Sequence, residues 1–364
     1  MELPALINVL QEKSQAFVCY RLPNLSEPVC LTGGKFTEMT NQEDIADLDG
    51  FIIAPFTYSP DNPFLLYKDY QFLEGWNPEF SDLVFAEHAG VPSSATRIHP
   101  IIDFQEYTRQ ANHMVSALRE GSLQKVVLSR VIRQNLPEGF QPGDFFKALC
   151  IEYPGAFVYL FNDGKGRCWA GATPEVLLEV EKGQGQTMSL AATLPAKKGG
   201  SHDLEWQKKE KEEQFLVTQF IRDKLIASDI NDFIEAELET RVAGPVVHLL
   251  KRFRFKLPMG FPVLKLAFSL HPTPAVCGLP LEQARQEILR VETHDRSYYS
   301  GFLGPVSNKT TTRLFVNLRC MQIIDKNAFI FVGGGLLAES DIEREWQETE
   351  LKAETLLSVI RKLN

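Results

Sequence analysis

The chain has 364 residues, with 38 Lys and Arg against 47 Asp and Glu, and a formal net charge of −9. Hydrophobic residues make up 44% and charged residues 23%, which excludes a disordered chain, a collagen-like chain and a coiled coil. At about 150 residues per domain, this length gives two domains or one large one. The acidic balance argues against nucleic-acid binding, which needs a basic face, but a few local cations can still bind an anionic small molecule.

Three features of the sequence indicate the cellular compartment of the protein. The longest apolar stretch, at 259–268, is interrupted by Lys265 and is shorter than the roughly 20 residues of a membrane span. The first residues carry Glu2 and no basic leader, so we expect no secretory signal. Six widely spaced cysteines without a CxxC motif favour reduced, buried thiols. These features predict a cytoplasmic protein that does not bind membranes.

The first 95 residues mix short apolar runs, such as 15–22 and 50–56, with Pro and Gly, which indicates strands and turns. Asp103 with Glu106 predicts a capped helix that ends at Gly121. Its apolar stripe comprises Phe104, Tyr107, Ala111, Met114, Val115 and Leu118.

The rest of the chain alternates between runs of strands and single helices. Strands are expected at 125–134, 156–162, 167–173, 175–182, 186–196, 312–324 and 328–335, and helices at 143–153, at 202–227 and from a Ser340/Glu343 cap to about Arg361. This order indicates an α+β fold rather than a doubly wound parallel sheet. Neither GxGxxG nor GxxxxGK[ST] occurs, which counts against dinucleotide and nucleoside triphosphate sites.

Two charged helices could carry chemistry. On the last helix Glu345, Glu348 and Lys352 share one face, although a solvated face has the same spacing. The stretch at 209–214 is densely charged, and an inward-facing Glu213 could be a metal ligand. Magnesium accepts one or two carboxylates together with water and substrate oxygens, so two glutamates from separate helices would suit it.

Two strands carry further candidates. Lys125 begins a strand and is either an exposed strand-end residue or a partly desolvated base. The stretch 331–337 contains three consecutive glycines and follows a strand with Arg319. It is either a turn or a place where the backbone and an arginine bind a carboxylate. The histidines show no HExxH spacing, which argues against a zinc hydrolase.

Taken in order, nine blocks resemble the chorismate-utilising enzyme family over about 230 residues, from 125 to 354. The blocks are KVVLSR (125–130), GATPEVLL (171–178), SLAAT (189–193), KEKEEQ (209–214), HPTPAVCG (271–278), RSYYSGFLG (296–304), NLRC (317–320), FVGGGLLAES (331–340) and EWQETELKAE (345–354). The resemblance implies one large α+β unit of packed, mainly antiparallel sheets with outer helices and an active site in a cleft between two halves. Residues 1–100 would be its variable N-terminal part and residues 101–364 its catalytic region.

The resemblance also implies roles for individual residues. Lys125 corresponds to the base that activates water for attack at C2 of chorismate, and Glu175 to the acid that protonates the hydroxyl leaving C4. Glu213 and Glu348 correspond to ligands of Mg²⁺. The implied substrate-binding residues are Arg319, Lys352, Gly333, Ala275, Tyr299, Leu318, Phe331 and Thr193, with His248 and His271 near the site.

Within the family, members that add water at C2 carry lysine at the position of Lys125, whereas anthranilate synthases do not. Aminodeoxychorismate synthases carry a nucleophilic lysine where this chain has Ala192. The resemblance therefore implies an isochorismate synthase, an isomerase of menaquinone or siderophore biosynthesis. A salicylate synthase, which also eliminates pyruvate, is the alternative, and a non-catalytic chorismate-binding protein is a more remote one. The implied enzyme is a monomer without a glutamine amidotransferase subunit.

The chain departs from the family pattern at three places. Ala192 stands where most members have glycine, and Gln214 replaces the histidine that usually follows the metal-binding glutamate. The segment at 246–255 lacks the threonine usually found after the His-Leu pair. None of these changes removes a proposed acid, base or ligand.

Overall fold

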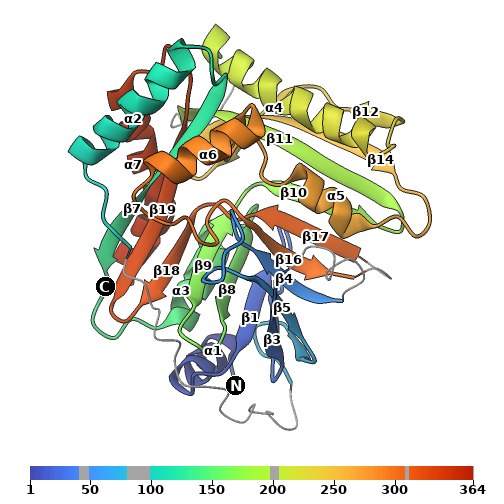
Figure 1. Ribbon diagram of the computed structural model, residues 1–364. Helices are drawn as coiled ribbons and strands as arrows, with labels where there is room; N and C mark the ends of the chain where they lie inside the picture. Colours follow the sequence, from blue (N-terminus) through green and yellow to red (C-terminus); the bar gives the residue numbers. More distant parts are fainter. Residues whose placement is uncertain (41–48, 80–98, 197–204, 308–310, 364) are drawn as a thin grey trace.

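Two antiparallel sheets stack face to face, and helices cover their outer faces (Figure 1). The computed structural model describes residues 1–40, 49–79, 99–196, 205–307 and 311–363. No helix in these ranges is both long and apolar enough to cross a membrane. All six cysteines are buried and unpaired with one another, as predicted.

The first sheet has nine strands and the second has ten. The nine-stranded sheet runs in the order β15 (Gly278–Leu279), β7 (Lys125–Asn135), β19 (Asn327–Leu336), β18 (Cys320–Ile324), β9 (Cys168–Thr173), β8 (Phe157–Asn162), β1 (Phe17–Arg21), β2 (Val29–Thr32) and β6 (Gln71–Glu74). The ten-stranded sheet runs in the order β12 (Phe233–Glu235), β14 (Val246–Lys256), β11 (Gln184–Pro195), β10 (Val176–Glu181), β17 (Thr311–Val316), β16 (Phe302–Val306), β4 (Gly50–Ala54), β5 (Phe64–Lys68) and β3 (Lys35–Met39), with β13 (Glu239–Ala243) paired to β14.

Separate apolar cores attach the helices to the sheets. The nine-stranded sheet packs against α1 (Leu3–Glu12), α3 (Pro142–Glu152) and α7 (Ile342–Lys362), and the ten-stranded sheet against α4 (Lys208–Ala227) and α5 (Val263–Leu270). A smaller core joins α2 (Phe104–Arg119) and α6 (Leu281–Val291) to β7 and the end of β19. Between the sheets lies an aromatic core, in which Phe157 of one sheet stacks on Phe315 of the other with ring centres 4.1 Å apart.

This architecture confirms the predicted α+β fold with antiparallel sheets. The two hairpins predicted between 156 and 196 form as β8–β9 and β10–β11. Asp103 caps α2 by accepting a hydrogen bond from the Glu106 backbone N–H. The described residues of the first hundred contribute strands to both sheets, and the division of the chain at residue 100 stays a prediction.

Several local predictions are wrong. Residues 3–12 form a helix, although only strands and turns were expected before residue 95. The charged helix begins at Lys208 rather than 202, and residues 202–204 lie outside the described ranges. Asp341, not Ser340, caps α7, because its side chain accepts from the Arg344 backbone N–H. Phe104 is 46% exposed and does not join the buried stripe of α2.

The expected strand at 312–324 is broken in the middle. Its first half is β17 in one sheet, and its second half is β18 in the other. Between them, Arg319 adopts a left-handed backbone conformation with φ of +49°, which is unfavourable for a residue with a side chain. The chain thus crosses between the sheets at 317–319, and this crossing brings Arg319 to the place where both sheets end.

Candidate active site

The chain crossing at residues 317–319 borders a small cavity of about 60 Å³, which we call the buried cavity. Eleven of the residues that the sequence predicted for the site line it: Glu175, Thr193, Glu213, His248, Ala275, Tyr299, Leu318, Arg319, Phe331, Gly333 and Lys352. They come from both sheets and from α4 and α7. Two more predicted residues contact the wall from behind. Lys125 forms an ion pair with Glu213, and Glu348 forms one with Lys352.

Lys125 is fully buried, so its interpretation as an exposed strand-end residue is wrong. Its Nζ atom lies 2.9 Å from Oε1 of Glu213, which projects from α4. Burial favours the neutral form of Glu213, but the charge of Lys125 and its contact with the carboxylate outweigh burial, so the pKa of Glu213 is lowered. The pair therefore links the start of β7 to α4 inside the protein.

The three consecutive glycines lie within β19 and not in a turn. A Cβ atom on Gly335 would lie 2.6 Å from Oε1 of Glu213 and 3.2 Å from Cε of Lys125. A Cβ atom on Gly333 would lie 2.7 Å from the Tyr299 hydroxyl. These glycines are needed because side chains from other elements occupy the space that their own side chains would fill.

Glu175 follows the end of β9 and is only 2% exposed. Burial raises the pKa of its carboxyl to about 8, although the positive charges of Lys125, Lys352 and Arg319 oppose this shift. At neutral pH the group is therefore mostly protonated. A buried carboxyl that keeps its proton at neutral pH is suited to act as a general acid.

Arg319 is held by neutral acceptors. Its guanidinium donates to the Lys352 carbonyl at 3.3 Å and lies 3.2 Å from Nε2 of His248. Burial and the charges of Arg319 and Lys352 keep the pKa of His248 well below its ordinary value, so the ring is neutral. Its Nδ1 lies 2.9 Å from the carbonyl oxygen of Ala192, which can only accept. Nδ1 therefore carries the proton and Nε2 accepts from Arg319.

Lys352 occupies the opposite part of the wall. Its Nζ donates to the Gly333 carbonyl at 2.9 Å and to Oε1 of Glu348 at 2.5 Å. Gly333 thus presents its carbonyl oxygen to Lys352. A lysine and an arginine that line the same small cavity are a suitable pair for an anionic ligand.

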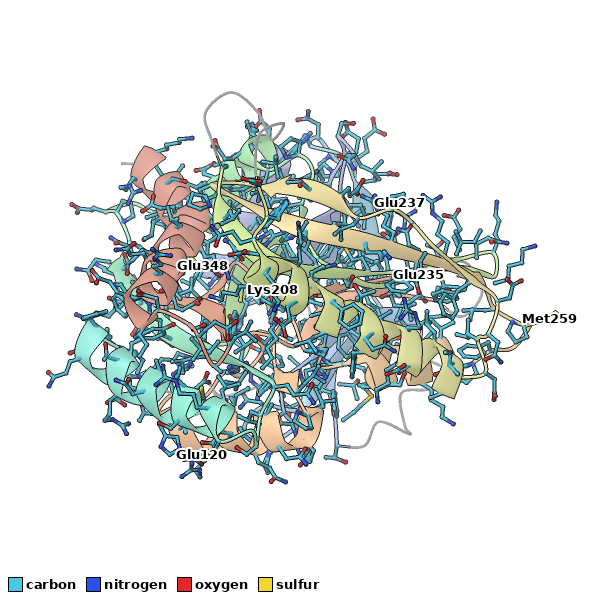
Figure 2. All side chains as sticks on the ribbon, turned by 90° about the horizontal axis from the view of Figure 1, so that it is seen from above. Glu120, Lys208, Glu235, Glu237, Met259 and Glu348 are labelled. Atoms are coloured by element: carbon cyan, nitrogen blue, oxygen red, sulfur yellow. The ribbon has the colours of Figure 1, made fainter. Side chains whose placement is uncertain are left out.

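The buried cavity shares Thr193, Glu213 and Gly335 with a second cavity of about 400 Å³. We call this second cavity the acidic mouth, because its wall carries Glu210, Glu213, Glu339, Asp341, Glu345 and Glu348. Lys209 and Glu345 are paired across it at 2.6 Å. Figure 2 accordingly shows the start of α4, marked by Lys208, beside the part of α7 that carries Glu348.

The acidic mouth fits a divalent cation. A Cβ atom on Gly334 would lie 3.5 Å from Oε2 of Glu345 and 3.8 Å from Oε1 of Glu348, so both carboxylates face the glycine stretch that Glu213 also approaches. Oε2 of Glu210 is buried and accepts no hydrogen bond from the described residues. Burial and the charge of Glu348 raise the pKa of Glu345 to about 7. Within the described residues no three ligands already form a cage, but Mg²⁺ needs only one or two carboxylates.

The structure does not bring every predicted residue to the site. His271 lies outside the buried cavity, where its Nε2 is 3.1 Å from the Pro55 carbonyl. Conversely, the sequence did not identify Val127, Pro174 and Val276 as wall residues. Glu210 was also missed, although it stands three residues before the predicted ligand Glu213, and Glu345 was placed on the face of Glu348 without a role at the site.

Ala192 and Gln214, which differ from the residues usual in the family, keep the site intact. Ala192 lines the buried cavity with a backbone φ of +59°, a conformation that glycine adopts at lower cost. Gln214 donates to Oγ of Ser189 at 2.8 Å and to the Ser189 carbonyl at 3.1 Å. Gln214 therefore ties α4 to β11 beside Glu213 through contacts that do not titrate.

The buried cavity is too small for a ring-shaped ligand, because small-molecule pockets usually enclose about 300–1,000 Å³. The ion pairs of Lys125 with Glu213 and of Lys352 with Glu348 lie beside it. Binding of an anion by the lysines and of a cation by the glutamates would separate these pairs. In this structure the charged groups beside the cavity neutralise one another.

We predict that Lys125→Met lowers the free energy of unfolding by about 3 kcal/mol, because it removes the nearest of the positive charges that stabilise the largely buried Glu213 carboxylate. The double variant Lys125→Met/Glu213→Gln should regain most of this loss. Chemical denaturation followed by circular dichroism measures both values. Lys211→Met, at an exposed position of α4, is the control and should match the wild type. Wild-type stability of Lys125→Met alone would contradict the buried pair.

We predict that Glu175→Gln stabilises the protein at pH 8. The folded state raises the pKa of Glu175, so its contribution to stability is complete below the unfolded pKa and is lost as pH rises to about 8. Glutamine removes this loss, and the midpoint of thermal unfolding should rise by about 3 °C, which corresponds to roughly 1 kcal/mol. At pH 4 the two proteins should unfold alike. A pH-independent difference would show that the carboxyl is not kept neutral by burial.

The chain is similar in sequence to known isochorismate synthases. The chain is 28% identical to the isochorismate synthase MenF of Haemophilus influenzae over 68% of its own length and 59% of that relative. It is 27% identical to the isochorismate synthase EntC of Escherichia coli K12, over 65% of its own length and 62% of that protein. The chain thus spans about six-tenths of these relatives.

A solved structure extends the likeness to almost the whole chain. The menaquinone-specific isochorismate synthase MenF from Escherichia coli shares the fold with a TM-score of 0.74 and 22% identity, over 95% of this chain and 88% of that one. The profile of the chorismate binding enzyme family matches residues 79–361, well over half of the sequence. The chain therefore belongs to the chorismate-binding enzyme family.

Proposed function

We propose that the protein is an isochorismate synthase, an isomerase that adds water at C2 of chorismate and removes the hydroxyl from C4. The observation that carries this proposal is the burial of Glu175 in the cavity wall, with its carboxyl mostly protonated, and of Lys125 directly behind the wall residue Glu213. Such an allylic displacement needs one group to take a proton and another to give one. Each well-placed group accelerates the reaction by about 10²–10⁴-fold.

In the proposed reaction, Lys125 must first leave Glu213 and lose its own proton; the neutral amine then takes a proton from the attacking water while the C2–O bond forms. The ring double bond shifts and the C4–O bond breaks. Glu175 gives its proton to the departing oxygen, which leaves as water. Arg319 and Lys352 bind the substrate carboxylates, and His248 holds the Arg319 guanidinium in place from behind.

Glu213 and Glu348 are the proposed ligands of Mg²⁺, with Glu210 and Glu345 beside them. The bound ion would supply positive charge to the ring carboxylate and so withdraw electrons from the ring. Gly335 and Gly334 leave the space above β19 free for these side chains.

The nearest alternative is a salicylate synthase, which forms isochorismate and then eliminates pyruvate. Leu318, before Arg319, favours the isochorismate synthase, since members of that group tend to have a branched aliphatic residue there. Thr193 is compatible with both reactions. A non-catalytic chorismate-binding protein is disfavoured because Lys125, Glu175, Glu213 and Glu348 are all present around one site.

We further propose that the product serves menaquinone biosynthesis, with siderophore biosynthesis as the alternative. Relatives named for each role occur among the isochorismate synthases that this chain resembles. We propose a cytoplasmic monomer that uses water and hence needs no glutamine amidotransferase subunit. Size-exclusion chromatography with light scattering tests the monomer. The pathway is tested in a bacterial strain that lacks its menaquinone-specific isochorismate synthase. Expression of this protein should restore growth that depends on menaquinone.

With chorismate and Mg²⁺, the protein should form isochorismate without releasing pyruvate. Chromatography identifies the product, and a lactate dehydrogenase assay measures pyruvate. Stoichiometric pyruvate together with salicylate fluorescence would show a salicylate synthase. If the folded protein does not convert chorismate at all, the non-catalytic chorismate-binding protein is the remaining interpretation. Glu175→Gln should lose nearly all turnover while remaining folded.

Activity should disappear with EDTA and return with added Mg²⁺. Glu213→Gln and Glu348→Gln should each raise the Mg²⁺ concentration for half-maximal activity by at least about tenfold, since each removes one charged ligand of a hard cation. Glu343→Gln, on an exposed position of the same helix as Glu348, is the control and should behave as wild type. Full turnover in metal-free buffer would refute the metal proposal.

A further inference from the structure

The buried cavity adjoins two larger cavities on different sides. The acidic mouth, of about 400 Å³, meets it at Thr193, Glu213 and Gly335. A cavity of about 920 Å³, which we call the arginine cavity, meets it at Pro174 and Arg319. A ligand can therefore approach the buried cavity from either side, and the charges of the two walls differ.

The wall of the acidic mouth carries an excess of negative charge. Six carboxylates line it, and three of them, Glu213, Glu345 and Glu348, are paired with Lys125, Lys209 and Lys352. The other three, Glu210, Glu339 and Asp341, face one further cation of the wall, Arg344. Lys209 is already paired with Glu345, and no ion pair of Arg344 occurs among the described residues. A divalent cation is attracted to such a wall, whereas an anion that carries two carboxylates is repelled by it.

The wall of the arginine cavity has a different balance of positive and negative charges. Its three carboxylates are each already neutralised: Glu152 by Lys362, Glu239 by Arg252 and Glu354 by Arg361. Two guanidiniums remain, Arg241 and Arg319, and the described residues place no carboxylate within ion-pair distance of either. Within the described parts of the chain, Arg241 donates to the Gly155 carbonyl, at 3.1 Å.

Arg319 lines both the buried cavity and the arginine cavity, and its present partners are neutral. The Lys352 carbonyl and His248 Nε2 accept from it at 3.3 and 3.2 Å. A carboxylate that enters the arginine cavity offers Arg319 a charge-assisted hydrogen bond, which is roughly twice as strong as a neutral one. An anion can thus draw the guanidinium away from these partners and open the way past Pro174.

We propose that the arginine cavity is the entrance for a small dicarboxylate, the substrate of the reaction proposed above, and that Arg241 receives this anion before Arg319 does. The divalent cation enters separately, through the acidic mouth. The identity of the anion rests on the proposed function, whereas its negative charge is inferred from the arginine cavity alone. Arg241 is accordingly a residue of the approach path and takes no part in the chemical step.

The first test compares kcat/KM for chorismate in Arg241→Gln, Arg241→Lys and Arg344→Gln. At an ionic strength of about 0.01 M, where the Debye length is about 30 Å, Arg241→Gln should lower kcat/KM at least fivefold, roughly the lower range of electrostatic steering, with kcat unchanged. At about 1 M, where the Debye length is about 3 Å, the difference should shrink to within about twofold. Arg241→Lys keeps the charge and should stay near the wild type, as should Arg344→Gln at the acidic mouth.

The second test does not depend on turnover. Malonate, a small dicarboxylate, should raise the thermal unfolding midpoint of the wild type and of Arg344→Gln, but not that of Arg241→Gln. Absence of a malonate effect on the wild type, or an equal effect on Arg241→Gln, would overturn the entrance. So would a larger loss of kcat/KM in Arg344→Gln than in Arg241→Gln. If malonate behaves as expected but chorismate is not converted, the anion site stands and the proposed function fails.

Discussion

The ion pair between Lys125 and Glu213 sets the geometry around the site. A buried pair offsets the cost of removing two charges from water only while both charges stay close together. The start of β7 and the inner face of α4 must therefore keep a fixed separation, with β19 between them. Glycine at 335 is a consequence, because any side chain there would occupy the position of the Glu213 carboxylate.

The same desolvation acts differently on each titratable group of the cavity. It keeps the proton on Glu175 and removes the charge from His248. Burial also lowers the pKa of Arg319, but only to about 10, so the guanidinium remains charged at neutral pH. One environment thus yields a neutral acid, a neutral imidazole and a fixed cation. The intrinsic basicity of each group, rather than a separate partner for each, decides these states.

Local patterns in the sequence were sufficient where neighbouring residues decide the structure. The Asp103 cap of α2 and the β8–β9 hairpin depend on contacts within a few residues, and both were predicted. Local pattern left Lys125 open between an exposed strand end and a desolvated base, because its burial depends on Glu213, which lies almost ninety positions away. Residues 333–335 were open to interpretation as a turn for the same reason. The side chains that require glycine there come from other segments.

The break between β17 and β18 shows the limit of periodicity most clearly. Residues 312–324 are rich in apolar residues, as one long strand would be, yet the two halves belong to different sheets. The aromatic core between the sheets, including Phe315, and the pairing of β18 with β9 and β19 override the continuous pattern. The strained Arg319 stands at the break. The sequence offered Arg319 as a possible carboxylate ligand, and the resemblance to the chorismate-utilising family assigned it to the site, but the hydrophobic pattern gave no sign of its left-handed backbone.

The net charge of −9 constrains how such a site can work. At low salt the whole protein repels an approaching dianion, so attraction must come from cations that lie closer to the path than the surrounding carboxylates do. Pairing of Glu152, Glu239 and Glu354 with nearby cations meets this condition at the arginine cavity. A single substitution at Arg241 changes the total charge by one unit out of nine. It removes one of the two cations on that wall for which the described residues show no ion pair. The ratio of variant to wild-type kcat/KM therefore reports the local field rather than the overall charge.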